Sequence, residues 1–237
     1  MRAVFLTFFL LMGCGLGETA AVAQDPVAAR PLSREAQALI APVLDAIEAE
    51  RARQAALPPP ANDREWLVRL GRLDQAPRQV LGQIDLSSLP AAEREVAGSA
   101  MWGAIWVMDT ANMAALLEMV PPEGWFLKSV YGEEAARAAF LIVQHSGLEH
   151  WRRFVPLLEP LVATGEVDGG QYALMYDRLQ TNQGLPQRYG SQMTCRDSRW
   201  ALFELEDQDR VDEWRKEMGM GPLDDYVARF AEEPPCD

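Results

Sequence analysis

The chain has 237 residues, with 35 acidic against 22 basic side chains, a formal charge of -13 and 49% hydrophobic residues. This length and apolar content supply enough material for a sizeable hydrophobic core, which excludes a mainly disordered protein. An acidic surface repels phosphates and lacks the basic stripe that nucleic-acid binding needs, so we expect no nucleic-acid partner. Length and charge therefore indicate a globular protein of another class.

The N-terminus has the three parts of a secretory signal peptide. Arg2 precedes an apolar run from Ala3 to Gly17, and Ala21-Val22-Ala23 forms a small-x-small cleavage site. The apolar run is too short to span a bilayer, and no later segment is long enough to do so. We therefore expect residues 1–23 to be removed and the mature protein to be periplasmic or secreted.

A bacterial lipoprotein signal is a second interpretation of the same segment. Leu11-Met12-Gly13-Cys14 resembles the box in which a small residue precedes the cysteine that is acylated and becomes the new N-terminus. Met12 at the middle position and the early cysteine fit this box poorly, whereas the site after Ala23 is well formed. Both alternatives stay open. A lipid anchor at Cys14 is the one membrane contact that we expect.

The remaining cysteines predict a disulfide. Cleavage at either site takes Cys14 out of the thiol count and leaves Cys195 and Cys236 as an even pair. Disulfides persist in oxidising compartments such as the periplasm. We therefore predict a Cys195–Cys236 bond that fixes the C-terminal tail to the loop after Gln192.

The mature chain has helical periodicity and few alternating β-branched runs, which predicts an all-α fold with at most a minor hairpin. We expect a linker and a peripheral N-terminal helix in residues 24–60, and a compact helical array in residues 61–237. Ser33 is placed to cap the first helix, and Pro42 either kinks that helix or marks its start near Ala41. Further helices are expected at Trp66–Leu73, from Pro90 to before Pro121, and at Glu133–His145, His150–Thr164, Gly170–Thr181, Asp209–Met218 and Leu223–Phe230.

Motifs of the commonest enzyme classes are missing from the sequence. There is no Cys-x-x-Cys pair, no His-Glu-x-x-His, no Walker loop, no Gly-x-Ser-x-Gly elbow and no dinucleotide fingerprint. The two histidines, His145 and His150, are too few for a His-rich metal site. We therefore expect neither a metal centre nor a cofactor.

Polar side chains interrupt apolar segments at three places. Gln144-His145 ends one predicted helix, Asp177-Arg178 lies inside another, and a loop contains Gln187, Tyr189 and Gln192. Charged and amide groups are costly to bury unless they satisfy one another. We therefore expect these side chains to converge on one site.

Each of these side chains has a candidate role. An imidazole can move protons near pH 7, so His145 is the candidate acid/base and Asp177 the carboxylate that would orient it. The alternative is a purely structural role, in which the histidine caps a helix beside an Asp-Arg ion pair. The candidate ligand-binding residues are Gln144, Arg178, Gln187, Tyr189 and Gln192.

The order of four motifs resembles a bacterial domain-of-unknown-function family marked by Gly-Trp-Pro, Gln-His, Asp-Arg and Gln-x-Tyr-Gly-Thr-Gln. Similar upstream elements of that family read Asp-Gln-x-x-Arg and Asp-x-x-Asn. The resemblance covers roughly Asp63 to Phe230 and implies a shared site without supplying a reaction. The matching segments here are Asp74-Gln75 with Arg78, Asp109 with Asn112, Gly124-Trp125, Gln144-His145, Asp177-Arg178 and Gln187 to Gln192.

Three positions depart from the family pattern. Phe126 stands where the family usually has Pro, and Ser191 where it usually has Thr, which keeps the hydroxyl. Trp151 stands where the family often has Gln, and this removes an amide from the expected pocket. Because of this third departure, the identity of the ligand stays open.

Two functions from different classes fit these residues. The first is an exported binding or interaction module with a polar pocket around His145, which would take a small polar ligand or a periplasmic protein. The alternative is a periplasmic hydrolase-like enzyme that uses His145 as acid/base and water as the attacking group. A functional site requires His145 to line an open pocket, whereas a structural network would bury it.

Overall fold

The structure, a computed structural model, describes residues 31–230, and those from Leu32 onward belong to one compact unit. Nine α helices, one 3₁₀ turn and one two-stranded sheet make up this part of the chain, so the all-α fold class is confirmed. The expected signal peptide, Cys14 and Cys236 lie outside the described residues. The export signal and the Cys195–Cys236 disulfide therefore stay predictions.

Helix α1 (Arg34–Ala55) begins where the capping residue predicts. The Ser33 hydroxyl accepts a hydrogen bond from the Ala36 amide at 3.1 Å, which satisfies one of the free amides of the first turn. The helix continues through Pro42, so a start near Ala41 is wrong. The apolar residues on both sides of Pro42 pack into one cluster, so its missing N–H interrupts the hydrogen-bond ladder without ending the helix.

Two helices bring together two parts of the candidate site that lie far apart in the sequence. Helix α2 (Asp63–Arg78) is capped by Asn62, and helix α5 (Glu133–Gln144) ends one residue before His145. They pack closely because Gly71 has no side chain: a Cβ there would lie 2.5 Å from the Cβ of Ala138. This close packing sets the C-terminal end of α5 beside the last turns of α2.

The other elements follow the predicted order. Helix α3 (Ala91–Met119) starts directly after Pro90, whose fixed φ suits a helix start. The remaining elements are η1 (Leu81–Gln83), α4 (Lys128–Tyr131), α6 (Leu148–Ala163), α7 (Gly169–Asn182), β1 (Met193–Arg196), β2 (Arg199–Leu202), α8 (Val211–Glu217) and α9 (Leu223–Phe230).

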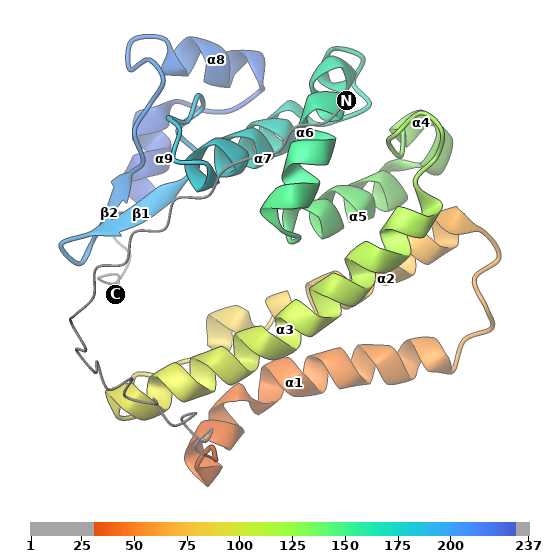
Figure 1. Cartoon of the computed structure of the whole chain (residues 1–237), viewed down its shortest axis with the longest axis vertical. Helices are drawn as coiled ribbons and strands as arrows, with labels where there is room; N and C mark the ends of the chain where they lie inside the picture. Colours follow the sequence, from red (N-terminus) through yellow and green to blue (C-terminus); the bar gives the residue numbers. More distant parts are fainter. Residues whose placement is uncertain (1–30, 231–237) are drawn as a thin grey trace, which may run out of the picture. The chain divides into compact units, whose positions relative to one another are not determined.

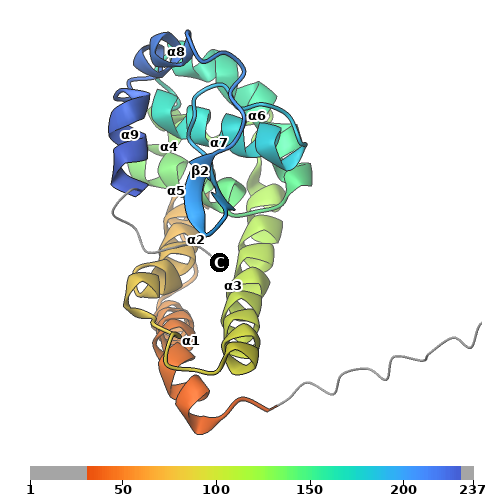
Figure 2. The same cartoon turned by 90° about the vertical axis from the view of Figure 1, so that its left-hand side faces the viewer.

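The helices form two groups with α5 between them. Helices α1, α2 and α3 lie side by side in one group, and α6 to α9 make up the other (Figures 1 and 2). Helix α5 packs against α2 and α3 of the first group and against α6 of the second. One apolar cluster joins α1 to the first half of α3 through residues such as Ile40 and Ile105. A larger cluster joins α2, α3, α5, α6 and α7 around Trp125, Phe126 and Phe154. The candidate site lies where the two groups adjoin.

The sheet is a single antiparallel hairpin, as the sequence predicts. Met193 pairs with Leu202, and the connecting residues Asp197 and Ser198 both have positive φ, of 52° and 56°. Two successive positive φ values match the twist of a tight hairpin turn. Among residues 31–230, no helix combines the length and the apolar character that a membrane crossing requires.

Candidate functional site

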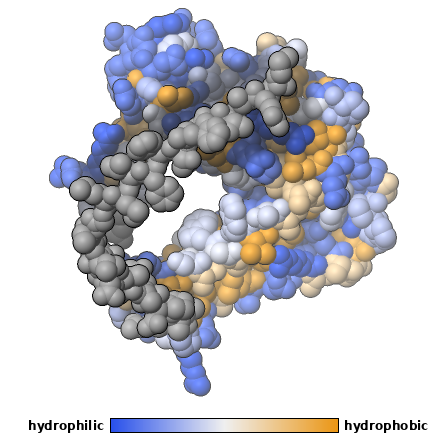
Figure 3. All heavy atoms as spheres, in the orientation of Figure 1, coloured by the Kyte–Doolittle hydropathy of each residue, from blue (hydrophilic) through white to orange (hydrophobic). Residues whose placement is uncertain are grey.

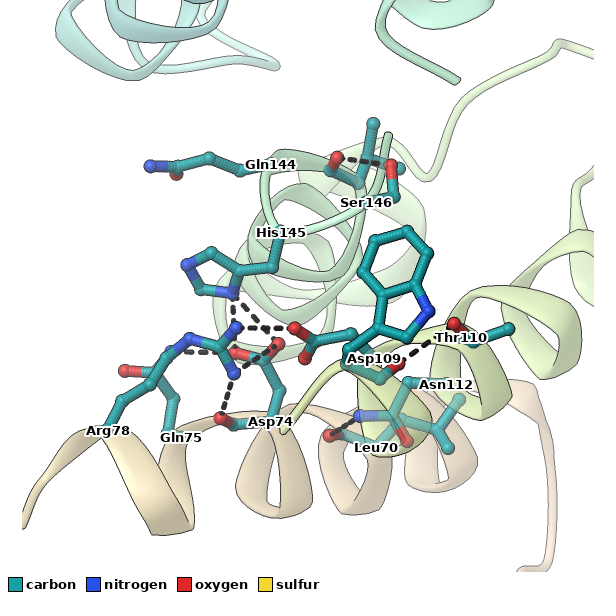
Figure 4. A network of polar contacts seen from close by, with 12 residues as sticks. Leu70, Asp74, Gln75, Arg78, Asp109, Thr110, Asn112, Gln144, His145 and Ser146 are labelled. Atoms are coloured by element: carbon teal, nitrogen blue, oxygen red, sulfur yellow. Dashed lines mark hydrogen bonds and ion pairs between the residues drawn. The ribbon is translucent and has the colours of Figure 1, made fainter. Parts of the chain in front are cut away.

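His145 pairs with a carboxylate that lies 71 positions away in the sequence. Its Nδ1 lies 2.8 Å from Oδ1 and 3.0 Å from Oδ2 of Asp74 on α2. The other ring nitrogen points away from Asp74 and has no hydrogen-bond partner among the described residues (Figure 4). A carboxylate at Nδ1 holds that nitrogen protonated, so Nε2 of the neutral ring is the proton acceptor.

Arg78 links the carboxylates of α2 and α3. Its Nη1 donates to the Asp74 main-chain oxygen at 2.7 Å and to Oδ1 at 3.3 Å, and its Nη2 donates to Asp109 Oδ2 at 2.8 Å (Figure 4). Gln75 Nε2 donates to Asp74 Oδ2 at 2.7 Å. The Asp74 carboxylate, with a side chain only 1% exposed, therefore has three side-chain partners.

Asp109 is the incompletely satisfied member of this group. Its Oδ1 is buried and has no hydrogen-bond partner among the described residues. Burial raises the pKa of Asp109, while the hydrogen bond and positive charge of Arg78 act in the opposite direction. A buried carboxyl with an unused oxygen is a typical feature of a ligand site, because leaving that atom unpaired costs free energy.

An open groove of about 510 Å³ runs past this cluster, and we call it the His145 groove. The His145 side chain is 17% exposed there. The space-filling view shows the surface hollowed on the side of α3 that faces α7 (Figure 3). The groove is lined by polar and aromatic side chains, among them Arg78, Trp102, Trp106, Asp109, Gln144, His145, Trp151 and Arg178.

Arg178 of α7 reaches the same groove as His145. Its Nη1 donates to the Gln144 main-chain oxygen at 3.2 Å, and its guanidinium lies 5.9 Å from the ring centre of Trp151. No acidic side chain pairs with it among the described residues. Burial lowers the pKa of Arg178, and the nearby Arg78 lowers it further. The Trp151 ring thus supports this guanidinium.

Asp177 lies elsewhere, and the prediction that it orients His145 is wrong. Its two oxygens accept hydrogen bonds from the main-chain amides of Arg188, Tyr189 and Ser191, at distances from 2.8 to 3.2 Å. Burial raises the pKa of Asp177, and the hydrogen bonds from these amides lower it. Successive helical residues point about 100° apart, so Asp177 and Arg178 face different partners.

The predicted loop residues also support the fold around Asp177. Gln187 is fully buried, and its amide bonds the main chain of Gln192 and Phe203. The Gln192 side chain donates to Ser191 Oγ at 3.0 Å. Tyr189 is 4% exposed and packs its ring on Tyr172 and Tyr176. These residues form a second polar set, which we call the Asp177 loop.

The seven predicted residues therefore divide into two groups. Gln144, His145 and Arg178 meet at the His145 groove, while Asp177, Gln187, Tyr189 and Gln192 belong to the Asp177 loop. The sequence predicts no role for Asp74, Arg78 and Asp109, although they belong to the site. The Asp-Gln-x-x-Arg and Asp-x-x-Asn elements, which contain these residues, could have pointed to them.

The residues of the site do not form a metal-ligand cluster in the described part of the chain. Between residues 31 and 230, no group of three or more His, Cys, Asp or Glu side chains is arranged to hold a metal ion. An adjoining groove of about 370 Å³ shares Trp106, Asp109 and His145, and it also contains His150. Both grooves thus share the wall that holds the Asp109 carboxyl.

Comparison with known proteins gives a family and no activity. Neither a curated protein nor a solved structure matches the chain. Residues 61–234 match the model of a family described as "Family of unknown function (DUF6624)". This match covers the His145 groove and the Asp177 loop together. The chain therefore belongs to this family of unknown function.

Proposed function

We propose that the protein is a binding module that takes a small polar ligand in the His145 groove. The observation that carries this proposal is the position of His145: Asp74 occupies Nδ1, while Nε2 has no partner among the described residues and lies at an open groove. The imidazole is thus held on one side by the fold and offers its other nitrogen to whatever enters the groove. A concave site with a few convergent polar groups is the usual form of a small-molecule site.

The polar groups at the groove suit a ligand with hydroxyl or acidic groups. The neutral form of His145 can accept a hydrogen bond at Nε2, and Arg178 can donate through the guanidinium nitrogens that have no partner among the described residues. The Asp74–Arg78 contacts fix the imidazole from behind, so its orientation is set before the ligand arrives. Such preorganisation reduces the entropy cost of binding.

The test is a ligand screen of the mature protein with a histidine variant and a control variant. Thermal shift and tryptophan fluorescence are recorded with small polar metabolites and cell-wall fragments. His145→Ala should abolish the response to a hit, and Arg152→Gln, a control on α6 that lines neither groove, should keep it. A hit that binds His145→Ala as tightly as the wild type would contradict the proposal.

A second candidate function is hydrolysis with His145 as acid/base. The Asp74–His145 contact of 2.8 Å favours it, because a carboxylate that fixes the tautomer makes the imidazole a better base. Water would be the attacking group and His145 Nε2 would accept its proton. Turnover of chromogenic esters, phosphoesters or glycosides that is lost in His145→Ala and at least tenfold lower in Asp74→Asn would support this function over simple binding.

We also propose that the protein acts after export, either free in the periplasm or anchored through a lipid at Cys14. The apolar N-terminal run and the Ala21-Val22-Ala23 site support the first form, and Leu11 to Cys14 the second. Intact-mass measurement of the purified mature protein separates them. An N-terminus at Gln24 supports cleavage, an acylated Cys14 supports the anchor, and an intact Met1 in membrane and periplasmic fractions contradicts both.

A further inference from the structure

Arg178 is a groove cation without an acidic partner among the described residues. Arg78 is committed to Asp74 and Asp109, whereas the guanidinium of Arg178 donates one hydrogen bond there, to the Gln144 main-chain oxygen. A guanidinium keeps its charge at neutral pH even where burial lowers its pKa. Holding such a charge partly out of water is costly unless an anion comes to it.

The charges of the groove favour a singly charged anion over a more highly charged one. Two carboxylates, Asp74 and Asp109, stand beside the single arginine Arg78 that binds both. Arg78 and Arg178 together balance these two charges, so a bound anion adds net negative charge to the groove, and an anion with a single charge adds the least. A carboxylate carries one charge and fits the guanidinium fork through two parallel hydrogen bonds. A phosphate monoester carries about 1.5 to 2 negative charges at pH 7 and would leave some of them facing Asp109.

Two exposed indoles flank this end of the groove. Trp102 and Trp106 lie four residues apart on α3, so they stand on the same helix face, and they are 53% and 60% exposed. Such large apolar faces at a polar groove mark a surface that a partner covers. A saturated ring with apolar C–H faces and polar edges fits them, because the edges can bond His145 and Gln144 while a face lies on an indole.

We propose that the His145 groove takes a sugar acid, a monocarboxylate carried on a sugar ring. Arg178 binds the carboxylate, Trp106 covers a face of the ring, and His145 Nε2 accepts a hydrogen bond from a ring hydroxyl. This inference rests on the proposed binding function and names its ligand class. Asp109 lines the same groove, and its Oδ1, buried without a partner among the described residues, is the atom to which a second hydroxyl of the ring would donate.

The test compares sugars that differ at one group. Glucuronate, glucose and glucose 6-phosphate share a ring and differ at one carbon, and N-acetylmuramate with N-acetylglucosamine forms a second pair with and without a carboxylate. Tryptophan fluorescence and calorimetry of the full mature chain give the affinities. We expect the acid of at least one pair to bind at least tenfold more tightly than its neutral partner, and glucose 6-phosphate more weakly than glucuronate.

Variants then assign the preference to its residues. Arg178→Gln should remove the preference for the acid, and Arg178→Lys should keep part of it because the charge remains without the fork. Trp106→Ala should weaken the acid and the neutral sugar by similar factors. Arg152→Gln, which removes an exposed arginine of α6 that contacts Gln183, is the matched control and should change nothing.

The outcomes separate this inference from the function on which it rests. Equal affinities within both pairs, tighter binding of the phosphate, or an acid preference that survives in Arg178→Gln would overturn the sugar acid. If no sugar binds while another metabolite gives a response that His145→Ala abolishes, the binding function stands and the ligand class is wrong. Failure of every ligand in the screen would remove both. Melting curves of each variant confirm that it is folded.

Discussion

The His145 groove and the Asp177 loop both centre on buried aspartates of helices, but the partners of these aspartates differ in kind. Asp177 is bonded by main-chain amides of its own loop, which cannot move away unless the loop unfolds. Asp74 is bonded by the side chains of Gln75, Arg78 and His145, which can rotate, and Asp109 keeps one oxygen without a partner among the described residues. Main-chain partners therefore indicate a structural carboxylate, and adjustable side-chain partners indicate a ligand site.

The largest expected effect is on the Asp177 loop. Asp177→Ala removes the acceptor of three main-chain amides, two of them buried, so we expect the free energy of unfolding to fall by about 2 to 4 kcal/mol. Urea unfolding followed by circular dichroism measures this change. Asp177→Asn keeps one acceptor oxygen and should lose less. A loss below about 1 kcal/mol in the alanine variant would mean that the loop does not depend on this carboxylate.

A smaller effect is expected at the groove. In His145→Ala, Asp74 keeps its contacts with Gln75 and Arg78, so the free energy of unfolding should fall by only about 1 kcal/mol. The same urea experiment measures it beside Asp177→Ala. Equal losses in the two variants would erase the contrast between the regions and make His145 a structural residue.

The smallest effect is a change in pH dependence at Asp109. Its pKa is raised in the folded state, so the protonated form is favoured, and the stability that this group contributes is lost as pH rises through the raised pKa. Asp109→Asn removes this titration and still offers Arg78 an oxygen. We expect the variant to gain stability relative to the wild type as pH rises from about 4, the ordinary pKa of an aspartate, through the raised pKa of Asp109. Urea unfolding at four pH values checks this, and a difference that stays constant with pH would show that Asp109 does not titrate there.

The sequence predicts local features of the fold well because their causes are local. Ser33 caps α1 through its own hydroxyl, and α9 spans the predicted Leu223–Phe230 because its apolar period lies within eight residues. Pro42 is the instructive exception. Its missing amide favours a break, but the apolar stripe on both sides of it packs into one cluster and keeps the helix continuous.

The pairing of site residues depends on packing, which no local pattern contains. Asp177 seemed the natural partner of His145 because both interrupt apolar helices, whereas the actual partner is Asp74, on a helix that packs closely against α5 where Gly71 meets Ala138. The buried polar groups do pair with one another, as expected. The expectation does not say which groups pair, and here they pair in two separate sets, the His145 groove and the Asp177 loop.

Helix α7 contributes one residue to each set, and this ties the order of its Asp-Arg dipeptide to the geometry of the molecule. Asp177 faces the amides of the loop and Arg178 faces the groove because neighbouring residues of a helix point in different directions. Exchanging the two would place a cation against three amide hydrogens and an anion over Trp151. Inserting one residue before the pair would turn both away from their partners. The order of the two residues, more than their presence, therefore determines which partner each one meets. Homologues should accordingly be aligned on this dipeptide without gaps.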